Sequence, residues 1–338
     1  MQYGFSIKRK CYLLSVLLMT VWLTGCVQEE FESTPSPAGN GIRFTLTVPD
    51  VNLPSVSSRT MTGTGTAKKE DEIETVDILV FDMSKTPAVF LEWVSATGVT
   101  QDLADNSTVS FSAVLSPTTA STCIVVVANK ELDNIVSGFT KGATTKVEAM
   151  EKMLHTQTGK WLADGSTTGG YTRIPMYGEK VISKITPSMN PITEINMKRM
   201  LARIDIRNNS VTSNFTVEEV YLANYNTTGY IAPAWNTNGQ VTDPVPDTPV
   251  LPAGSGKMTE EGDAIRYSVN GNTPYDGEIY TFESLAAEDA GGAGADGEAS
   301  RKDATCLIVK GRIGTGESTF YRVDFTKNGN TGEQVEYL

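Results

Sequence analysis

The sequence predicts an all-β protein made of two tandem antiparallel β-sandwiches, with one short helix in the first. Two observations lead to this fold class. Short runs rich in β-branched and aromatic residues recur between turn formers, and loops join these runs where an α/β protein would have crossover helices. The chain has 338 residues, which is long for one domain and comfortable for two.

The first half begins with an alternating stretch, "GIRFTLTVP" at 41–49. Its apolar side chains fall on one face of a strand: Ile42, Phe44, Leu46 and Val48. Further strands are expected at 72–82, 107–115, 123–130 and 174–185. One amphipathic helix is expected near residues 145–156. His155 would lie near its C-terminal end, where a cation suits the helix dipole.

The second half repeats the strand pattern. Strands are expected at 192–208, 215–225, 264–269, 278–284, 305–313 and 318–325. Two polar stretches rich in Gly and Pro, 232–257 and 288–302, are expected to be surface loops. We place the N-terminal sandwich at 41–197 and the C-terminal sandwich at 198–338.

The first 25 residues have the pattern of a secretory signal peptide. Lys8, Arg9 and Lys10 precede an apolar run, 12–23, that is too short to span a bilayer comfortably. The run ends in Leu-Thr-Gly-Cys, which resembles a bacterial lipobox. The resemblance implies cleavage between Gly25 and Cys26 and a lipid on the Cys26 thiol. An ordinary signal peptide with a chance cysteine is the alternative.

Residues 26–40 predict a disordered tether, because they are rich in Ser, Pro and Gly. Glu29, Glu30 and Glu32 resemble the acidic export signal of surface lipoproteins in the Bacteroidota, and a solvated acidic tether is the alternative. The chain has 28 basic and 40 acidic residues. Loss of the signal peptide removes three basic residues and no acidic one, which leaves a net charge of −15. Such a charge argues against binding to nucleic acid.

No catalytic, cofactor-binding or metal-binding residues are predicted, so the chain is not expected to be an enzyme. It contains one histidine and lacks paired Cys/His spacing, a nucleophile elbow and a phosphate-binding loop. Asp77 and Asp82 lie on one expected strand and could be taken for a catalytic carboxylate pair, but structural roles explain them more simply. Cys123 and Cys306 are interpreted as buried free thiols, with a disulfide as the alternative.

The middle of the chain resembles the FimA-type fimbrillins, the type V pilus subunits of Bacteroidales. "RIPMYGEK" at 173–180 followed by "INMKRMLARIDIRN" at 195–208 carries the resemblance. Four more stretches follow the family in the same order: 76–82, 217–233, 278–284 and 320–325. The resemblance implies Greek-key sandwiches of the transthyretin-like type. It also implies a subunit that serves adhesion on the cell surface.

The resemblance gives a role to Arg59, which lies in the polar loop 50–71. In that family an arginine-specific or trypsin-like protease cuts in this loop, here between Arg59 and Thr60, and releases the first strand. A strand from another pilus subunit then fills the open groove. The lipid would carry the precursor to the outer membrane, and the cut would release the subunit from it. A solvated loop arginine is the alternative.

Two further expectations concern the whole chain. The family pattern continues past Leu338, so the C-terminal sandwich is expected to be incomplete at its C-terminus and the chain to be a fragment or a variant subunit. A second function class is a monomeric surface glycan-binding lipoprotein of a polysaccharide-uptake system. Loss of the signal peptide leaves Trp93, Trp161 and Trp235, of which Trp161 and Trp235 lie in loop-like sequence and would be the candidates for sugar platforms. A loop aromatic packed on its own domain is the alternative for each. Which position in the pilus the chain takes, stalk, tip or anchor, is left open.

Overall fold

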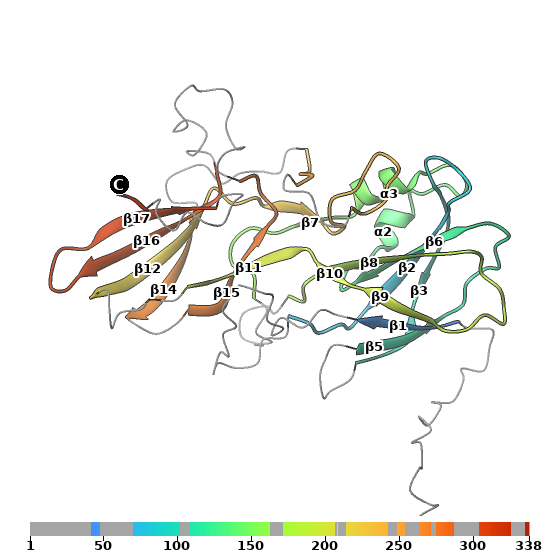
Figure 1. Ribbon diagram of the computed structural model, residues 1–338, viewed down its shortest axis with the longest axis horizontal. Coiled ribbons are helices and arrows are strands. Elements are labelled where there is room, and N and C mark those ends of the chain that lie inside the picture. Colours follow the sequence, from blue (N-terminus) through green and yellow to red (C-terminus); the bar gives the residue numbers. More distant parts are fainter. Residues whose placement is uncertain are drawn as a thin grey trace, which may run out of the picture. The chain divides into compact units, whose positions relative to one another are not determined.

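The structure is a computed structural model of the chain (Figure 1). It describes residues 42–47, 70–101, 108–162, 172–206, 208, 214–242, 249–253, 264–271, 275–286, 304–325 and 335–337. These residues are mostly strands, so the predicted all-β class is confirmed.

Two sheets share one apolar core in the first part of the chain. One sheet has the strand order β4-β5-β1-β9 and the other the order β10-β8-β6-β2-β3. Neighbouring strands are antiparallel except β1 and β9, which run parallel. The strands are β1 (Ile42–Thr47), β2 (Val76–Asp82), β3 (Val89–Ser95), β4 (Thr97–Gln101), β5 (Thr108–Ala113), β6 (Thr122–Ala128), β8 (Met176–Ile182), β9 (Ile192–Asn196) and β10 (Lys198–Arg199).

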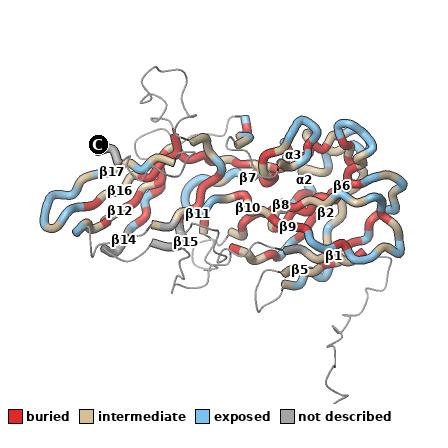
Figure 2. Tube along the Cα trace, in the orientation of Figure 1, coloured by how far each residue is buried: buried red, intermediate tan, exposed pale blue. Residues whose placement is uncertain are grey.

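Strand β6 is buried on both faces, and so is most of β2 (Figure 2). One face packs on the core shared with β1 and β5, through Ile124 and Val126. The other face packs on a second apolar cluster, through Val125 and Val127. Burial on both sides explains why this stretch of the sequence is continuously apolar and shows no alternation.

A second pair of sheets follows in the chain. One has the strand order β14-β12-β16-β17-β18, and β11 pairs with β15 in the other. Their core includes Val220, Tyr267 and Ile279. The strands are β11 (Leu201–Ile206), β12 (Phe215–Ala223), β14 (Ile265–Gly271), β15 (Tyr275–Phe282), β16 (Cys306–Ile313), β17 (Thr319–Asp324) and β18 (Val335–Tyr337).

The second apolar cluster covers the outer face of β2, β6 and β8. It combines helix α2 (Asp133–Val136), helix α3 (Lys146–Lys152) and side chains from the later part of the chain, including Ile231, Tyr280 and Phe282. Beside it, β7 (Leu154–Thr156) pairs with β13 (Thr228–Tyr230). The boundary expected between residues 197 and 198 stays a prediction, because residues on both sides of it contribute to this cluster.

The helical region differs from the sequence prediction in two ways. The described residues form two helices where one was expected, because α2 is only four residues long and leaves no periodic signal. Helix α3 starts with a capping box between Thr145 and Glu148 and ends at Lys152, short of the expected end near residue 156. The next residues form strand β7, whose backbone pairs with β13 and which contains His155. The placement of His155 at a helix C-terminus is therefore wrong.

His155 packs its ring against Trp161 and Phe282, with centroid distances of 5.0 and 6.3 Å. Burial, and then the nearby charge of Lys130, lower the pKa of His155 below its ordinary value, although a hydrogen bond with Gln157 opposes them. The environment therefore favours the neutral imidazole.

This environment predicts a pH-dependent stability. The unfolded chain binds a proton at His155 near pH 6.5, and the folded chain binds it only at lower pH. The stabilisation is therefore fully present above pH 6.5 and is lost as the pH falls through that value towards the lowered pKa. His155→Phe keeps an apolar ring but cannot bind a proton, so its free energy of unfolding should lack this pH-dependent part. Urea unfolding of both proteins between pH 5 and 8 measures it. Since the chain has one histidine, a constant difference across this range would contradict the assignment.

Candidate functional site

Strand β1 lies between two partners in its sheet, β5 and β9 (Figure 1). It pairs antiparallel with β5, with Ile42 opposite Ala113 and Thr47 opposite Thr108. On its other side it pairs parallel with β9, with Phe44 opposite Ile192. Removing β1 would therefore leave two strand edges facing each other across a gap one strand wide.

The core face of β1 is buried at the two positions whose side chains are described. Phe44 is 0% exposed and Ile42 is 4% exposed. The Phe44 ring stacks on Phe111 of β5 with a centroid distance of 5.0 Å. Arg43 and Thr45 are half-buried and point to the opposite face. The alternation seen in the sequence thus identified the buried face of this strand.

The other predicted site residues are placed only in part. Leu46 pairs by its backbone with Val109 and Ile195, and nothing is described of its side chain. The remaining predicted residues lie outside the described part of the chain: Gly25, Cys26, Val48, Arg59 and Thr60. The described chain resumes at Glu70, so β1 and Glu70 bound the segment that contains Arg59.

Glu70 is only 3% exposed and is held by several groups from later strands. Its carboxylate accepts hydrogen bonds from Nη1 of Arg203, at 2.9 and 3.0 Å, and from the hydroxyl of Tyr280, at 2.6 Å. Its backbone oxygen accepts a bond from Nε of Arg199 at 3.1 Å. We call this arrangement the Glu70 clamp. It ties the chain after the Arg59 segment to β10, β11 and β15.

The residues that follow Glu70 are also fixed by side chains. The Gln101 amide donates to the backbone oxygen of Asp71, at 2.7 Å, and accepts from the backbone N–H of Ile73, at 3.1 Å. The Asn129 amide makes a matching pair of bonds to Glu72 and Glu74. Sequence reasoning missed the clamp, because Glu70 lies in the charged run "KKEDE", which looks like a solvated loop.

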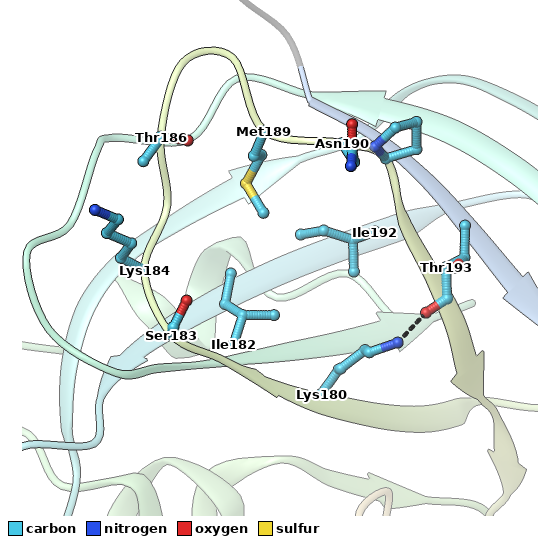
Figure 3. A pocket seen from close by; sticks show the side chains of 10 residues that line it. Lys180, Ile182, Ser183, Lys184, Thr186, Met189, Asn190, Ile192 and Thr193 are labelled. Atoms are coloured by element: carbon cyan, nitrogen blue, oxygen red, sulfur yellow. Dashed lines mark hydrogen bonds between the residues drawn. The ribbon is translucent and has the colours of Figure 1, made fainter.

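A pocket of about 430 Å³ lies where β8 connects to β9 (Figure 3). Ile182, Met189 and Ile192 line it, and all three also pack on the core that contains Phe44. Nζ of Lys180 donates to the backbone oxygen of Thr193 at 2.5 Å, across the pocket. The pocket therefore adjoins β9, one of the two strands that hold β1.

The two aspartates of β2, Asp77 and Asp82, each accept hydrogen bonds that stabilise the local structure. Asp77 is 7% exposed and accepts a hydrogen bond from Oγ of Ser95 at 2.7 Å, and burial raises the pKa of its carboxyl. Asp82 caps a turn by accepting from the N–H of Ser84, and hydrogen bonds from Ser84 lower its pKa. Within the described ranges no three His, Cys, Asp or Glu side chains are grouped as metal ligands would be.

Two other expectations concern cysteine and tryptophan. Cys123 and Cys306 are buried and free, as interpreted. Trp161 is 4% exposed and its indole N–H donates to the backbone oxygen of Thr172. Trp93 and Trp235 are half-buried against the second apolar cluster, which also contains Trp161. Trp161 is therefore not an exposed sugar platform, and packing covers part of Trp93 and of Trp235. In the described part of the chain no helix is both long and apolar enough to cross a membrane.

Comparison with known proteins places this arrangement in a family. Residues 35–288 match the model of the fimbrillin-A associated anchor proteins Mfa1 and Mfa2. The chain belongs to this family. The matched range includes both β1 and the Glu70 clamp. Family membership makes the chain a fimbria-associated protein of the cell surface. The narrower assignment to the FimA-type fimbrillins themselves stays a prediction.

Solved structures of fimbrial proteins are similar to this anchor-family chain at low identity. The tip fimbrial protein Mfa3 from Porphyromonas gingivalis, with a C-terminal truncation, shares 14% identity and a TM-score of 0.43, over 84% of this chain and 81% of its own. A fimbrial assembly protein from Parabacteroides distasonis shares 13% identity and a TM-score of 0.43, over 85% of this chain and 87% of its own. No curated protein sequence matches the chain.

Proposed function

We propose that the chain is an accessory subunit of a cell-surface pilus that exchanges β1 for a strand of a neighbouring subunit. The position of β1 supports this proposal. It is an inner strand, it contributes Phe44 to the core, and residues 48–69 separate it from the Glu70 clamp. A cut in that segment would release β1 and leave the rest of the sandwich attached through the clamp.

The lipid and the protease complete the proposal. A lipid on Cys26 holds the precursor at the outer membrane, since several acyl chains on one residue anchor durably. An arginine-specific or trypsin-like protease cuts between Arg59 and Thr60, which separates the lipid and β1 from the rest of the chain. The incoming strand then restores the backbone hydrogen bonds of β5 and β9. The pilus built in this way serves adhesion.

Arg59→Ala in the native host should block incorporation into the pilus, because β1 would keep its place between β5 and β9. The measurement is the amount of the chain in pili sheared from the cells, with N-terminal sequencing of the incorporated form. The wild-type form should begin at Thr60. Arg59→Lys is the matched variant: it supports incorporation if the protease is trypsin-like and prevents it if the protease is arginine-specific. Normal incorporation of the alanine variant with residues 41–59 still attached would refute the release of β1.

The glycan-binding alternative receives no support from the described tryptophans. Trp161 is buried, and Trp235 packs edge to face on Tyr230 with a centroid distance of 4.9 Å. We therefore retain pilus assembly as the proposed function.

A further inference from the structure

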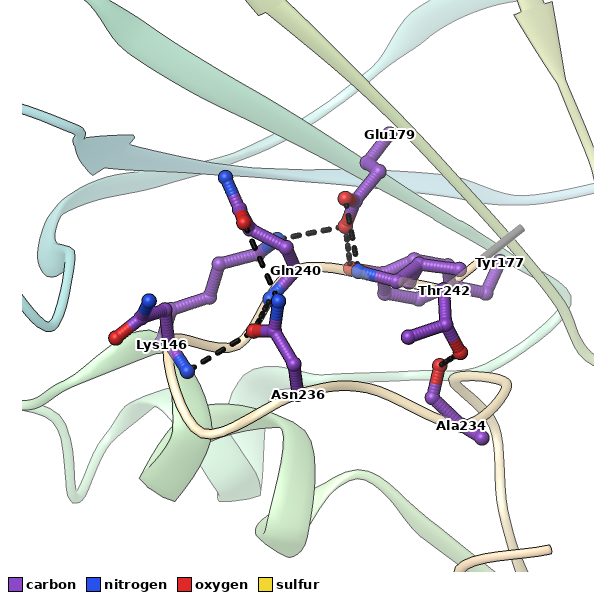
Figure 4. A network of polar contacts seen from close by, with 9 residues as sticks. Lys146, Tyr177, Glu179, Ala234, Asn236, Gln240 and Thr242 are labelled. Atoms are coloured by element: carbon purple, nitrogen blue, oxygen red, sulfur yellow. Dashed lines mark hydrogen bonds and ion pairs between the residues drawn. The ribbon is translucent and has the colours of Figure 1, made fainter. Parts of the chain in front are cut away.

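Lys146 is a fully buried lysine at the start of helix α3 (Figure 4). Lysine is seldom completely buried unless a partner accepts its charge. Here Nζ of Lys146 lies 2.6 Å from Oε2 of Glu179 on β8, and the two side chains are 1% and 18% exposed. An amine and a carboxyl group are thus held in contact, 33 residues apart in the sequence.

Residues from other parts of the chain pack closely around Lys146. Cys123 lies close enough that the charge of Lys146 affects its thiol, yet burial raises the pKa of that thiol to about 11. On the other side Gly239, with a φ of 74°, packs over the Lys146 stem so closely that a Cβ there would lie 3.2 Å from Cβ of the lysine. The amine is thus held against the carboxyl group with little room to move away.

The two oxygens of Glu179 have different partners. Oε2, the oxygen beside Lys146, also accepts a hydrogen bond from the Tyr177 hydroxyl at 2.5 Å. Burial, and then the charge of Glu179, raise the pKa of Tyr177 well above its ordinary value, so the hydroxyl keeps its proton. Oε1 accepts a hydrogen bond from the backbone N–H of Val241 at 3.3 Å. One oxygen faces a proton donor, and the other faces a backbone donor of the kind that stabilises an oxyanion.

We propose that Lys146 and Glu179 form an intramolecular amide bond in the folded chain. A proton first passes from the Lys146 ammonium to Oε2, which gives an amine and a carboxylic acid. Nζ then attacks Cδ of Glu179 while negative charge on Oε1 is stabilised by the Val241 N–H. The Cδ–Oε2 bond breaks, and Tyr177 passes a proton to Oε2 and regains one from the nitrogen. One water leaves, so the step needs no oxidant or other reactant.

The bond would link α3 covalently to β8, which lies between β10 and β6 in its sheet. Such a link resists separation of these elements under force, which an ion pair does less well. The proposal does not depend on strand exchange, since the three hydrogen bonds that carry it join Glu179 to Lys146, Tyr177 and Val241, and β1 takes part in none of them.

Peptide mapping of the purified, denatured full chain tests the proposal. We expect a branched peptide that contains both Lys146 and Glu179 and is lighter than the sum of its parts by one water. Lys146→Arg and Glu179→Ala should give only unlinked peptides. Glu179→Gln should form the same bond with loss of ammonia, and Tyr177→Phe should form it about 100-fold more slowly. Unlinked peptides at full mass from the wild-type chain would overturn the proposal and leave an ion pair only, whether or not the variants fold.

Discussion

Replacing Phe44 by alanine is expected to destabilise the uncut chain by about 3–5 kcal/mol. The side chain is 0% exposed and stacks on Phe111, so its removal loses apolar burial and leaves a cavity in the core beside Phe111. The effect should disappear in a subunit that has exchanged β1, because the variant residue then no longer belongs to the sandwich. Amide hydrogen exchange of β5, before and after cleavage and exchange, measures both states.

Thr45→Ala is the matched control for this experiment. Thr45 lies on the same strand but is half-buried on the opposite face, so its replacement should change the exchange of β5 far less. An equal effect of Phe44→Ala in the uncut chain and in the assembled pilus would show that β1 stays in place, which contradicts the proposed exchange.

Replacing Glu70 by alanine is expected to destabilise the chain by about 2–3 kcal/mol, because hydrogen bonds to a buried charged group are stronger than neutral ones. Arg203 and Tyr280 would lose this acceptor, at 2.9 and 2.6 Å, and the carboxylate is only 3% exposed. In the cut chain the consequence should be larger, since the new N-terminal segment depends on the clamp and on Gln101 and Asn129 to stay attached. Limited proteolysis of the cut chain should then remove residues beyond Glu70.

Glu74→Ala is the matched control, because it removes a nearby carboxylate that is exposed to solvent. Its carboxylate pairs with Arg173 at 2.6 Å, but the Glu74 side chain is 60% exposed. Ion pairs so exposed to solvent contribute about 0–1 kcal/mol to the free energy of unfolding. Urea unfolding of both variants separates the two cases. Equal small losses would mean that Glu70 contributes no more than a surface charge and that the clamp does not hold the segment.

Local patterns predicted many of the strands, but they missed β3, β4, β7 and β13 and did not divide 192–208 into β9, β10 and β11. The alternation of Ile42 and Phe44 identified the core face of β1, and the apolar run of β6 indicated a strand covered on both sides. The same patterns do not encode direction, so the parallel pairing of β1 with β9 was not anticipated. His155 was misplaced because the residues after Lys152 continue a helical pattern while their backbone pairs with β13.

The sequence by itself determined the β class and the buried face of the first strand, because each depends on neighbours within a few residues. The exit signal ending in Cys26 stays a prediction. Only the tertiary structure decided that Glu70 meets Arg203 and Tyr280, which are 133 and 210 residues away. It also decided that Lys146 is enclosed with Glu179. The physical reason is the same in both cases. Whether a charged side chain is solvated or buried depends on which distant strands pack around it, and a charged residue has no local signal that distinguishes the two.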